Sequence, residues 1–473
     1  MRKTKIICTV GPSVDSEEVF RKLILAGMNV ARFNFSHADP VVDKRRFDML
    51  VKVRNELGLP VASMLDTKGP EIRLGKFKDN KPVTINDGDE FTLTANDIEG
   101  TSEIASVTFK GLPTDVSEGT KILINDGAVE LEVISSNSTD IKCRVIHGGV
   151  LSNHKGVNVP GVALSLPYIS EADMTDLEFG AKTSFDFIAA SFVRSGADVS
   201  YLRKFTHSLG WNNVKIIAKI ENRDGVENID EILEAADGIM VARGDMGVEI
   251  PFEQIPAIQK ELISKGYRAG KQVITATQML ESMINNPRPT RAEITDVANA
   301  IYDGTSAIML SGETAAGKYP VEAVETMARI AECTESNIDY GSRLTKIKSK
   351  TSCDVTEAIS HATVTTAVDL NASAIITVTK SGNTAKMISK YRPPCTIVGL
   401  TPDPVTCRQL NMSWGVYPAL IEEMSNTDDL IGSAFELSKK HGFVNSGDTV
   451  VATAGVPLGI SGNTNLLEVG TID

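Results

Sequence analysis

Short apolar runs recur along the chain, and after each run apolar residues return every three or four positions. The runs predict buried strands, and the stretches that follow them predict amphipathic helices. Eight such pairs begin near residues 5, 29, 61, 185, 214, 238, 272 and 306. Because strands that are apolar on both faces are typical of a parallel sheet covered by helices, the pattern predicts a (β/α)₈ barrel. An open doubly wound sheet is the alternative.

Polar residues and glycines mark the expected ends of several helices. Asp15 and Ser170 precede amphipathic stretches, as residues at helix starts do. Gly27, Gly180 and Gly270 stand where such helices should end, because glycine is common just beyond a helix C-terminus.

The spacing of the runs indicates an insertion, because about a hundred extra residues separate the third run from the fourth. In this segment, residues 70–167, apolar and polar residues alternate in short runs, with turn signals such as NDGD (86–89) between them. We therefore expect a small all-β domain inserted after the third strand of a barrel built from residues 1–69 and 168–342. An insertion at the C-terminal rim of the barrel, where active sites of this fold lie, is expected to act as a lid. A rigid decoration is the alternative.

A third region follows residue 342, beyond a polar stretch. Helix-like and strand-like runs alternate in residues 343–473, but they are too few for a second barrel. We expect a C-terminal domain with an open α/β sheet.

Polar and ionisable side chains occupy the C-terminal ends of all eight predicted barrel strands. Packing alone would not place them there, and these strand ends meet at one rim of a barrel. In chain order they include Thr9, Arg32, Asn34, Ser36, His37, Asp66, Thr67, Ser191, Lys219, Glu221, Arg243, Asp245, Thr277, Ser311 and Glu313.

The types of these side chains suggest metal and phosphate binding. Lys219 and Glu221 are two positions apart in a predicted strand, so they point to the same face. Glu221 and Asp245 offer the oxygen ligands that Mg²⁺ or Mn²⁺ prefers, although ion pairs with Lys219 or Arg243 are the alternative. Arg32 and Lys219 are cations suited to a phosphate.

Two further groups at the rim carry weaker signals. The glycines around Asp245, Gly244 among them, leave backbone N–H groups that could hold a carboxylate. Asn34, Ser36, Asp66 and Thr67 could bind a monovalent cation, but from the residues alone we favour ordinary turn and cap interactions.

A metal, cations and backbone donors beneath a lid are typical of phosphoryl transfer, in which positioning and charge stabilisation provide most of the catalysis. No Walker A sequence is present, so we expect no P-loop nucleotide site.

Composition excludes several other classes of protein. The formal net charge of −13 and the isoelectric point of about 5.1 argue against a nucleic-acid-binding protein. No apolar stretch approaches the length of a membrane span, and the N-terminal apolar run is too short for a signal peptide. The six cysteines show no C-x-x-C spacing, so we expect reduced thiols and a cytoplasmic location.

Several long segments resemble signature segments of the pyruvate kinase family. They are ARFNFSH (31–37), LDTKGPEIR (65–73), HKGVNVPG (154–161), IIAKIENRDGV (216–226), VARGDMGVEIP (241–251), TATQMLESMINNPRPTRAE (275–293) and MLSGETAAGKYP (309–320). The resemblance runs through nearly the whole chain and includes the domain order. It implies a glycolytic enzyme that transfers phosphate from phosphoenolpyruvate to ADP, giving pyruvate and ATP, and that forms homotetramers. It also implies the bacterial type that lacks an extra C-terminal phosphohistidine-type domain.

The resemblance assigns roles at the substrate site. Glu221 and Asp245 would hold Mg²⁺, while Arg32 and Lys219 would bind the transferring phosphate. The backbone of Gly244 and Asp245, together with Thr277, would receive the substrate carboxylate. Either Thr277 or Ser311, through water, would deliver the proton to the enolate carbon.

The resemblance also implies a nucleotide site and a K⁺ site. Arg73 and Lys155 would meet the nucleotide phosphates, with Asn34 and His37 nearby. K⁺ would be bound by Asn34, Ser36, Asp66 and Thr67, in place of the turn interactions favoured above. Family members with glutamate at the position of Glu71 tend to need K⁺, so we expect K⁺ activation.

A second site is expected in the C-terminal domain, in TKSGNTAK (379–386), which follows a predicted strand and opens a helix. Its residues could cradle a phosphate at the helix N-terminus, although a plain helix cap is equally expected. In the family the matching loop binds a phosphorylated activator, and a later loop, here near 455–463, closes over it. The predicted effector residues are Thr379, Ser381, Gly382, Asn383 and Thr384.

Two other functions remain as alternatives. A metal-dependent C–C lyase of the pyruvate/oxaloacetate type uses the same barrel with Glu and Asp ligands, but would need neither the lid nor Arg73 and Lys155. A non-catalytic metabolite sensor would have lost ligands, whereas Lys219, Glu221, Asp245 and Thr277 are all present.

Overall fold

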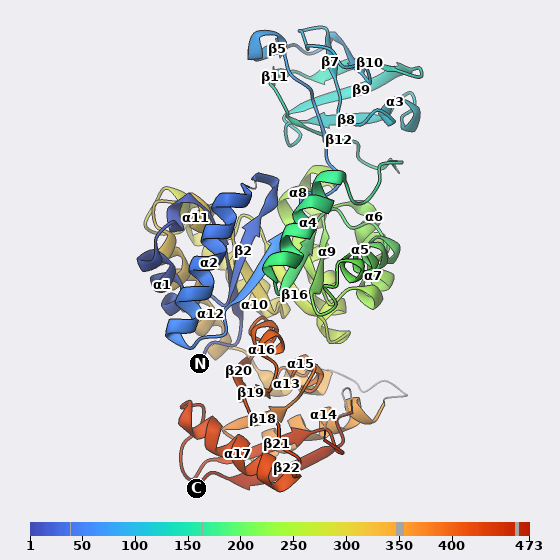
Figure 1. Ribbon diagram of the computed structural model, residues 1–473. Coiled ribbons are helices and arrows are strands. Elements are labelled where there is room, and N and C mark those ends of the chain that lie inside the picture. Colours follow the sequence, from blue (N-terminus) through green and yellow to red (C-terminus); the bar gives the residue numbers. More distant parts are fainter. Residues whose placement is uncertain (38, 163, 347–353, 459–462) are drawn as a thin grey trace.

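The computed structural model describes residues 1–37, 39–162, 164–346, 354–458 and 463–473. Three parts follow one another along one axis: an all-β domain, a barrel, and a C-terminal α/β domain beneath the barrel (Figure 1). No helix among these residues is long and apolar enough to cross a bilayer.

The barrel is a closed ring of eight parallel strands, which confirms the predicted fold and excludes the open sheet. Neighbours around the ring follow the order β1-β17-β16-β15-β14-β13-β3-β2. The strands are β1 (Lys5–Val10), β2 (Val30–Asn34), β3 (Ala62–Asp66), β13 (Phe187–Ala190), β14 (Lys215–Ile220), β15 (Gly238–Ala242), β16 (Gln272–Ala276) and β17 (Ala307–Leu310). β3 and β13 pair directly, although the all-β domain separates them in the sequence.

Helices surround the barrel because each strand is followed by an amphipathic segment. The longer ones are α1 (Glu17–Ala26), α2 (Pro40–Leu57), α4 (Glu171–Thr183), α5 (Gly196–Ser208), α7 (Ile229–Ala235), α9 (Ile255–Arg268), α10 (Arg291–Asp303) and α12 (Pro320–Ser336). Short helices α6 (Arg223–Glu227), α8 (Arg243–Glu249) and α11 (Gly312–Ala315) follow β14, β15 and β17 at the upper rim.

The helix ends agree with most of the predicted signals. Ser170 forms a capping box with Asp173 at the start of α4, and Gly27 caps the end of α1. The prediction for Gly180 is wrong, because α4 continues to Thr183. Gly180 lies inside the helix, and a Cβ there would come within 2.6 Å of Leu65 Cδ1, so close packing explains this glycine.

The inserted all-β domain after β3 is also confirmed. Its main sheet has the order β4-β12-β8-β9-β10-β6-β7, and β11 pairs with β5 in a second, two-stranded sheet. The bounds are β4 (Ile72–Arg73), β5 (Val83–Ile85), β6 (Glu90–Thr94), β7 (Ile104–Ser106), α3 (Leu112–Asp115), β8 (Lys121–Ile124), β9 (Val129–Ser136), β10 (Asp140–His147), β11 (Gly149–Leu151) and β12 (Gly156–Asn158). The domain has its own apolar core.

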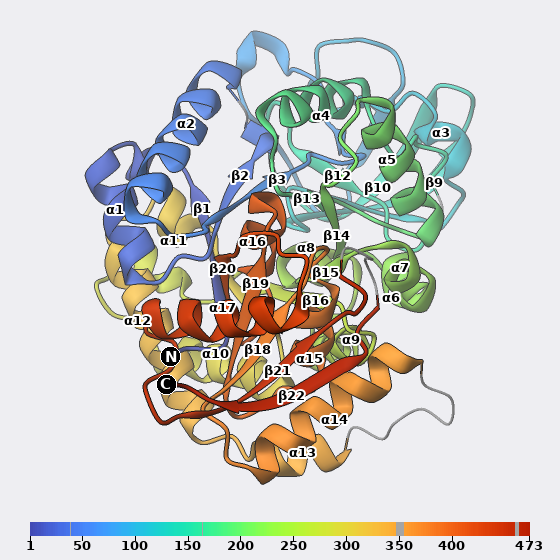
Figure 2. The same cartoon turned by 60° about the horizontal axis from the view of Figure 1, so that its bottom comes forward.

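The C-terminal domain has the predicted open sheet, with the order β20-β19-β18-β21-β22. α17 packs on one face of this sheet, and α14, α15 and α16 pack on the other (Figure 2). The elements are α13 (Tyr340–Lys346), α14 (Val355–Asp369), β18 (Ala374–Val378), α15 (Asn383–Lys390), β19 (Thr396–Thr401), α16 (Pro404–Leu410), β20 (Val416–Leu420), α17 (Thr427–Lys440), β21 (Thr449–Ala454) and β22 (Leu466–Thr471).

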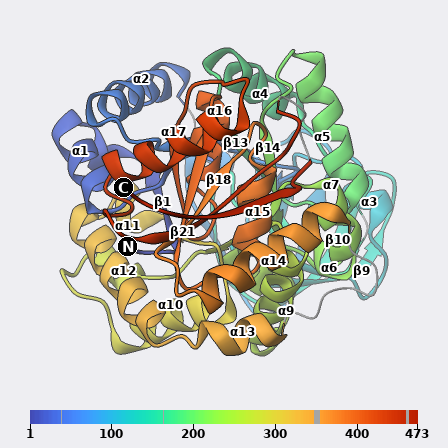
Figure 3. The same ribbon diagram turned by 90° about the horizontal axis from the view of Figure 1, so that it is seen from below.

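The C-terminal domain closes the lower end of the barrel (Figure 3). Met412, which follows α16, is fully buried and belongs to the same apolar cluster as the barrel-interior residues Met64, Ile217 and Met309. The lower end of the barrel is therefore completed by a side chain from another domain.

Candidate active site

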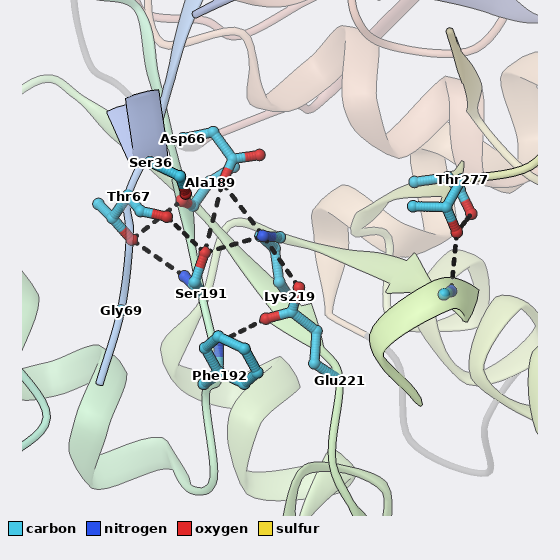
Figure 4. Close-up of polar contacts among 12 residues, drawn as sticks. Ser36, Asp66, Thr67, Gly69, Ala189, Ser191, Phe192, Lys219, Glu221 and Thr277 are labelled. Atoms are coloured by element: carbon cyan, nitrogen blue, oxygen red, sulfur yellow. Dashed lines mark hydrogen bonds and ion pairs between the residues drawn. The ribbon is translucent and has the colours of Figure 1, made fainter. Parts of the chain in front are cut away.

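Buried charges gather where β2, β3 and β14 end at the upper rim. Figure 4 shows three of them, Asp66, Lys219 and Glu221. Asp66 accepts a hydrogen bond from Arg32 Nε at 2.6 Å and one from Lys219 Nζ at 3.1 Å. Burial alone would raise the pKa of Asp66, but the charges of Arg32 and Lys219 outweigh it and hold the pKa below its usual value. Asp66 thus stays ionised and fixes both cations.

Lys219 lies among three oxygen atoms. Its Nζ is 2.8 Å from Ser191 Oγ and 2.9 Å from Glu221 Oε1, besides its contact with Asp66. Burial opposes the charged amine, but the carboxylates of Asp66, Glu221 and Asp245 prevail and raise the pKa of Lys219 above its ordinary value. The side chain is therefore a permanent cation, suited to stabilise negative charge rather than to exchange protons.

Glu221 is almost completely buried, with 1 % of its surface exposed. Its Oε2 accepts a hydrogen bond from the backbone N–H of Phe192 at 2.6 Å. Its Oε1 forms the ion pair with Lys219 but accepts no well-aligned hydrogen bond from the described residues. Burial raises the pKa of Glu221, and the charge of Asp245 raises it further. The ion pair between Glu221 and Lys219, one alternative considered for these charges, is therefore present. Arg243 pairs with Asp296 at 2.7 Å and not with either of the two carboxylates.

The pair Glu221 and Asp245 fits a divalent cation. Asp245 lies exposed in the first turn of α8 and makes no hydrogen bond or ion pair with any residue that the structure describes. The described chain contains no cluster of three or more metal-ligating side chains. Two carboxylates without a third suit Mg²⁺, which commonly takes its remaining ligands from water and substrate.

The residues predicted for K⁺ come from two neighbouring strands. Asn34 ends β2 and pairs in register with Asp66 at the end of β3. Ser36 follows in the short 3-10 helix Phe35–His37, and its N–H donates to Asn34 Oδ1 at 3.3 Å. Thr67 Oγ1 accepts from the N–H of Ser191 at 3.1 Å. Asp66 thus belongs to both the cation cluster and this oxygen-rich group.

Thr277 holds a strained backbone conformation just beyond β16, with φ at +69°. Such a value is rare for a β-branched residue and is typical of functional sites. Its Oγ1 accepts from the N–H of Gly244 at 2.9 Å and donates to the carbonyl of Ala276 at 2.6 Å. The N–H of Gly244, predicted to be free, is therefore occupied by Thr277, so the two predicted substrate-carboxylate residues touch each other.

Ser311 stands apart from this cluster. It caps α11 at the end of β17, and its N–H donates to Glu313 Oε2 at 2.7 Å. Its Oγ makes no hydrogen bond with the residues that the structure describes, so the choice between Ser311 and Thr277 as proton donor stays open.

A cleft of about 620 Å³ separates the upper rim from the all-β domain. Arg73, Lys155 and Asp245 line it, whereas Asn34 does not. Arg73 is held by Glu71 Oε2 at 2.8 Å and by the carbonyl of His154 at 2.9 Å. The His37 side chain lies outside the described part of the chain.

The chain matches two family models, "Pyruvate kinase, barrel domain" over residues 1–324 and "Pyruvate kinase, alpha/beta domain" over residues 357–470. It belongs to the pyruvate kinase family. It is 50% identical to the pyruvate kinase of Sporosarcina psychrophila, covering 100% of this chain and 81% of that one, and 48% identical to the pyruvate kinase of Clostridium acetobutylicum, with both chains covered fully. A crystal structure of a pyruvate kinase from Cryptosporidium parvum superposes with a TM-score of 0.95 at 41% identity, covering 100% of this chain and 96% of that chain.

These relatives are pyruvate kinases throughout, so the chain is a phosphotransferase with pyruvate kinase activity. The C–C lyase and the non-catalytic sensor, considered from the sequence, are thereby set aside.

The site of this pyruvate kinase also depends on contacts that the sequence did not reveal. Ser191 bonds Lys219, Asp66 and the carbonyl of Thr67, at 2.8, 3.3 and 2.6 Å. Its place at a strand end was visible, but its role as the link between Lys219 and Thr67 was not. The backbone N–H of Phe192, which binds Glu221, depends on a left-handed conformation with φ at +52° and has no sequence signal.

Asp173 and Gly69 fix the connection to the lid. The N–H of Gly69 donates to Asp173 Oδ1 at 3.2 Å, and φ at Gly69 is +74°. A Cβ at Gly69 would lie 2.8 Å from Ser191 Cβ. The connection between the barrel and the all-β domain thus runs directly over Ser191, which bonds Lys219.

The predicted effector segment lies beside a pocket of about 410 Å³ in the C-terminal domain. Thr379, Ser381 and Thr384 line it, whereas Gly382 and Asn383 do not. Gly382 is the left-handed N-cap of α15 and donates its N–H to Thr379 Oγ1 at 3.1 Å. Of the predicted closing loop, residues 459–462 lie outside the described residues, while Gly455, Leu458 and Asn463 line the pocket.

Proposed function

We propose that this pyruvate kinase transfers phosphate from phosphoenolpyruvate to ADP with Mg²⁺ held by Glu221 and Asp245. The observation that carries the proposal is the buried Oε1 of Glu221, which has no aligned hydrogen-bond donor and lies beside Lys219. Bound Mg²⁺ would supply positive charge to orient and neutralise the substrate phosphate. The charge environment supports Lys219 and Arg32 as the protein's own cations for the same phosphate.

Thr277 and the backbone of Gly244 and Asp245 receive the substrate carboxylate in this proposal. Release of the Gly244 N–H from Thr277 Oγ1 would free both groups for that carboxylate. Arg73 and Lys155, which line the cleft, would hold the nucleotide phosphates. The family resemblance adds Asn34 and His37 to this proposed nucleotide site.

Metal binding tests the first part directly. Mn²⁺ titrated into the protein and followed by electron paramagnetic resonance should show a site that is lost in Glu221→Gln. The matched control is Glu249→Gln, a second partly buried glutamate in the cleft, which should bind Mn²⁺ like the wild type. Equal binding by Glu221→Gln and wild type would contradict the assignment.

K⁺ is the second proposed cofactor, bound by Asn34, Ser36, Asp66 and Thr67. Its charge beside Asp66 would add to that of Arg32 and Lys219. Activity at fixed Mg²⁺ should be several-fold lower in buffer free of Na⁺ and K⁺ than in K⁺. Equal activity in the two buffers would show that this site is not used.

We also propose that a phosphorylated metabolite activates the enzyme at the C-terminal pocket. The hydroxyls of Thr379, Ser381 and Thr384 and the amine of Lys380 lie at the pocket. To bind one phosphate group, Thr384 would exchange its hydrogen bond with Thr464 and Lys380 its ion pair with Glu423. Thr384→Glu would place a like charge against it and should abolish activation by AMP or sugar phosphates. Activation of wild type and variant alike would place the site elsewhere. The homotetramer and the cytoplasmic location remain predictions.

A further inference from the structure

α16 contacts the lower end of the barrel at a buried carboxylate, that of Asp186. Arg408, on α16, donates from Nε to Asp186 Oδ1 at 2.9 Å. The neighbouring Gln409 donates from Nε2 to the carbonyl of Asp186 at 3.1 Å and to that of Asn213 at 2.8 Å. Asp186 is 1 % exposed, so these contacts lie inside the interface.

The second oxygen of Asp186 binds the neighbouring barrel strand. Oδ2 accepts from the N–H of Ser63 at 2.9 Å and from Ser63 Oγ at 3.0 Å. Asp186 also donates its own N–H to the carbonyl of Ser63 at 3.1 Å. Arg54 of α2 adds a third charge, 3.8 Å from Oδ2. One carboxylate therefore connects α16 to the starts of both β3 and β13.

The other ends of these two strands hold Lys219. β3 ends at Asp66, and β13 is followed by Ser191, and both side chains bond Lys219 Nζ, at 3.1 and 2.8 Å. The strands are in register, with Phe187 opposite Met64 and Ala189 opposite Asp66. About 10 Å of paired, buried strand separates Ser63 from Asp66. Such close-packed structure has low compressibility and passes on small displacements.

The opposite side of α16 lies close to Gly382, in the predicted effector segment. A Cβ added to Gly382 would lie 3.2 Å from Thr406 Cγ2 and 3.2 Å from Leu410 Cδ2, both on α16. Gly382 is the residue whose N–H binds Thr379 beside the pocket. α16 thus bonds Asp186 on one side and on the other approaches Gly382, whose neighbour Ser381 lines the C-terminal pocket.

We propose that Arg408, acting through Asp186, is a positioning residue for Lys219, and that α16 links the C-terminal pocket to β3 and β13. The regulatory half of this inference rests on the effector site proposed above. The positioning half rests on the pyruvate kinase activity alone.

The barrel contains a second aspartate–arginine pair that does not contact α16, although the charge of Lys386 on α15 acts on its carboxylate. Asp237 precedes β15 as Asp186 precedes β13, and its Oδ2 accepts from the N–H of Ile216 on the neighbouring β14 at 3.0 Å. Its arginine is Arg203, at 2.9 Å, on the barrel's own helix α5. Arg203→Met therefore loosens the start of a barrel strand without touching α16.

The experiment compares Arg408→Met, Arg408→Lys and Arg203→Met with wild type. KM for phosphoenolpyruvate and kcat are measured without and with AMP, ribose 5-phosphate and fructose 1,6-bisphosphate, and thermal unfolding is measured on the same variants.

Arg408→Met should raise KM by about 2- to 30-fold and bring the ratio of KM without and with effector close to one. Arg408→Lys should recover part of both effects. Arg203→Met should lower the unfolding temperature but keep the effector ratio of the wild type. Equal loss of the ratio in both Met variants would overturn the link.

A double-mutant cycle with Ser191→Ala tests the positioning half independently of any effector. If Arg408 acts through β13 on Ser191, its effect on kcat/KM should shrink by about threefold or more in the Ser191→Ala background. Additive effects would overturn the positioning role. If no phosphorylated compound changes the wild-type KM, the effector site and its link to α16 fail, and the cycle alone decides the positioning role.

Discussion

The two ends of the barrel differ in how completely individual carboxylates are paired, as Asp186 and Glu221 show. At the lower end, Asp186 receives hydrogen bonds on both carboxylate oxygens and lies beside two arginines, Arg408 and Arg54. At the upper end, the buried Glu221 receives one backbone hydrogen bond and pairs with Lys219, and the exposed side chain of Asp245 has no partner among the described residues. A buried charge without partners is costly. The complete pairing of Asp186 therefore stabilises the lower end and its contact with the C-terminal domain, whereas the carboxylates at the upper end can still accept a ligand.

Backbone strain adds to this contrast. Phe192, Thr277 and Gln278 have positive φ values of 52°, 69° and 54°, and they follow β13 and β16 at the upper end. Phe192 presents the N–H that binds Glu221, and Thr277 binds the N–H of Gly244. The upper end therefore combines incomplete charge pairing with strain, which is the usual composition of a site organised for a ligand rather than for stability.

The sharpest test of the contrast is Lys219→Met at the upper end. It removes the cation that we assign to the transferring phosphate, so kcat should fall by about 10³- to 10⁵-fold. The fold should persist, because Arg32 still neutralises Asp66 and Glu221 can take up a proton. Steady-state kinetics, circular dichroism and Mn²⁺ binding measure these outcomes. Substantial turnover by the variant would refute the assigned role.

At the lower end the expected loss is stability. Asp186→Ala leaves Arg408 and the N–H of Ser63 without their buried partner, which should cost about 3–5 kcal/mol in the free energy of unfolding. Glu221→Gln at the upper end should cost far less, because its carboxylate is incompletely paired. Urea unfolding of both variants compares the two ends. Similar losses of unfolding free energy in both variants would show that the two carboxylates do not differ in this way.

The smallest effect is expected from Glu249, at the end of α8 in the cleft. Burial raises its pKa to about 7, and the charge of Asp224 contributes. A carboxyl whose pKa is higher in the folded state stabilises the fold below its unfolded pKa, about 4.3, and this stabilisation is lost as pH rises through about 7. Glu249→Gln should therefore flatten the decline in unfolding temperature between pH 5 and 8. Glu253→Gln, on an exposed side chain, is the control and should follow the wild type. A Glu249→Gln curve parallel to the wild type would contradict the role of this group.

Periodic apolar patterns were sufficient to predict the barrel, the insertion and the open C-terminal sheet. They missed short elements whose stability comes from their surroundings. α16 has seven residues, and β20 contains Pro418, so neither has a clear period. Gly180 shows a related limit, because a glycine needed for packing has the same sequence signal as one that ends a helix.

For the site, strand-end position and spacing were sufficient to predict which side chains gather, and Lys219 and Glu221 do contact each other. The role of Ser191, the backbone donor of Phe192 and the occupied N–H of Gly244 could not be predicted from the sequence. These depend on backbone angles and on strands brought together by closure of the barrel. The pair Asp186 and Arg408, separated by 222 residues, has no local signal at all.

Met412 has a consequence for how such chains can be recombined. Because a residue of the C-terminal domain completes the apolar interior of the barrel, the two domains share one core at that point. In a chimera that joined this barrel to a relative's C-terminal domain, another residue would take the place of Met412, and the packing of the barrel interior would change with its volume. Exchange of C-terminal domains between relatives therefore requires that Met412 and the barrel residues around it be exchanged together.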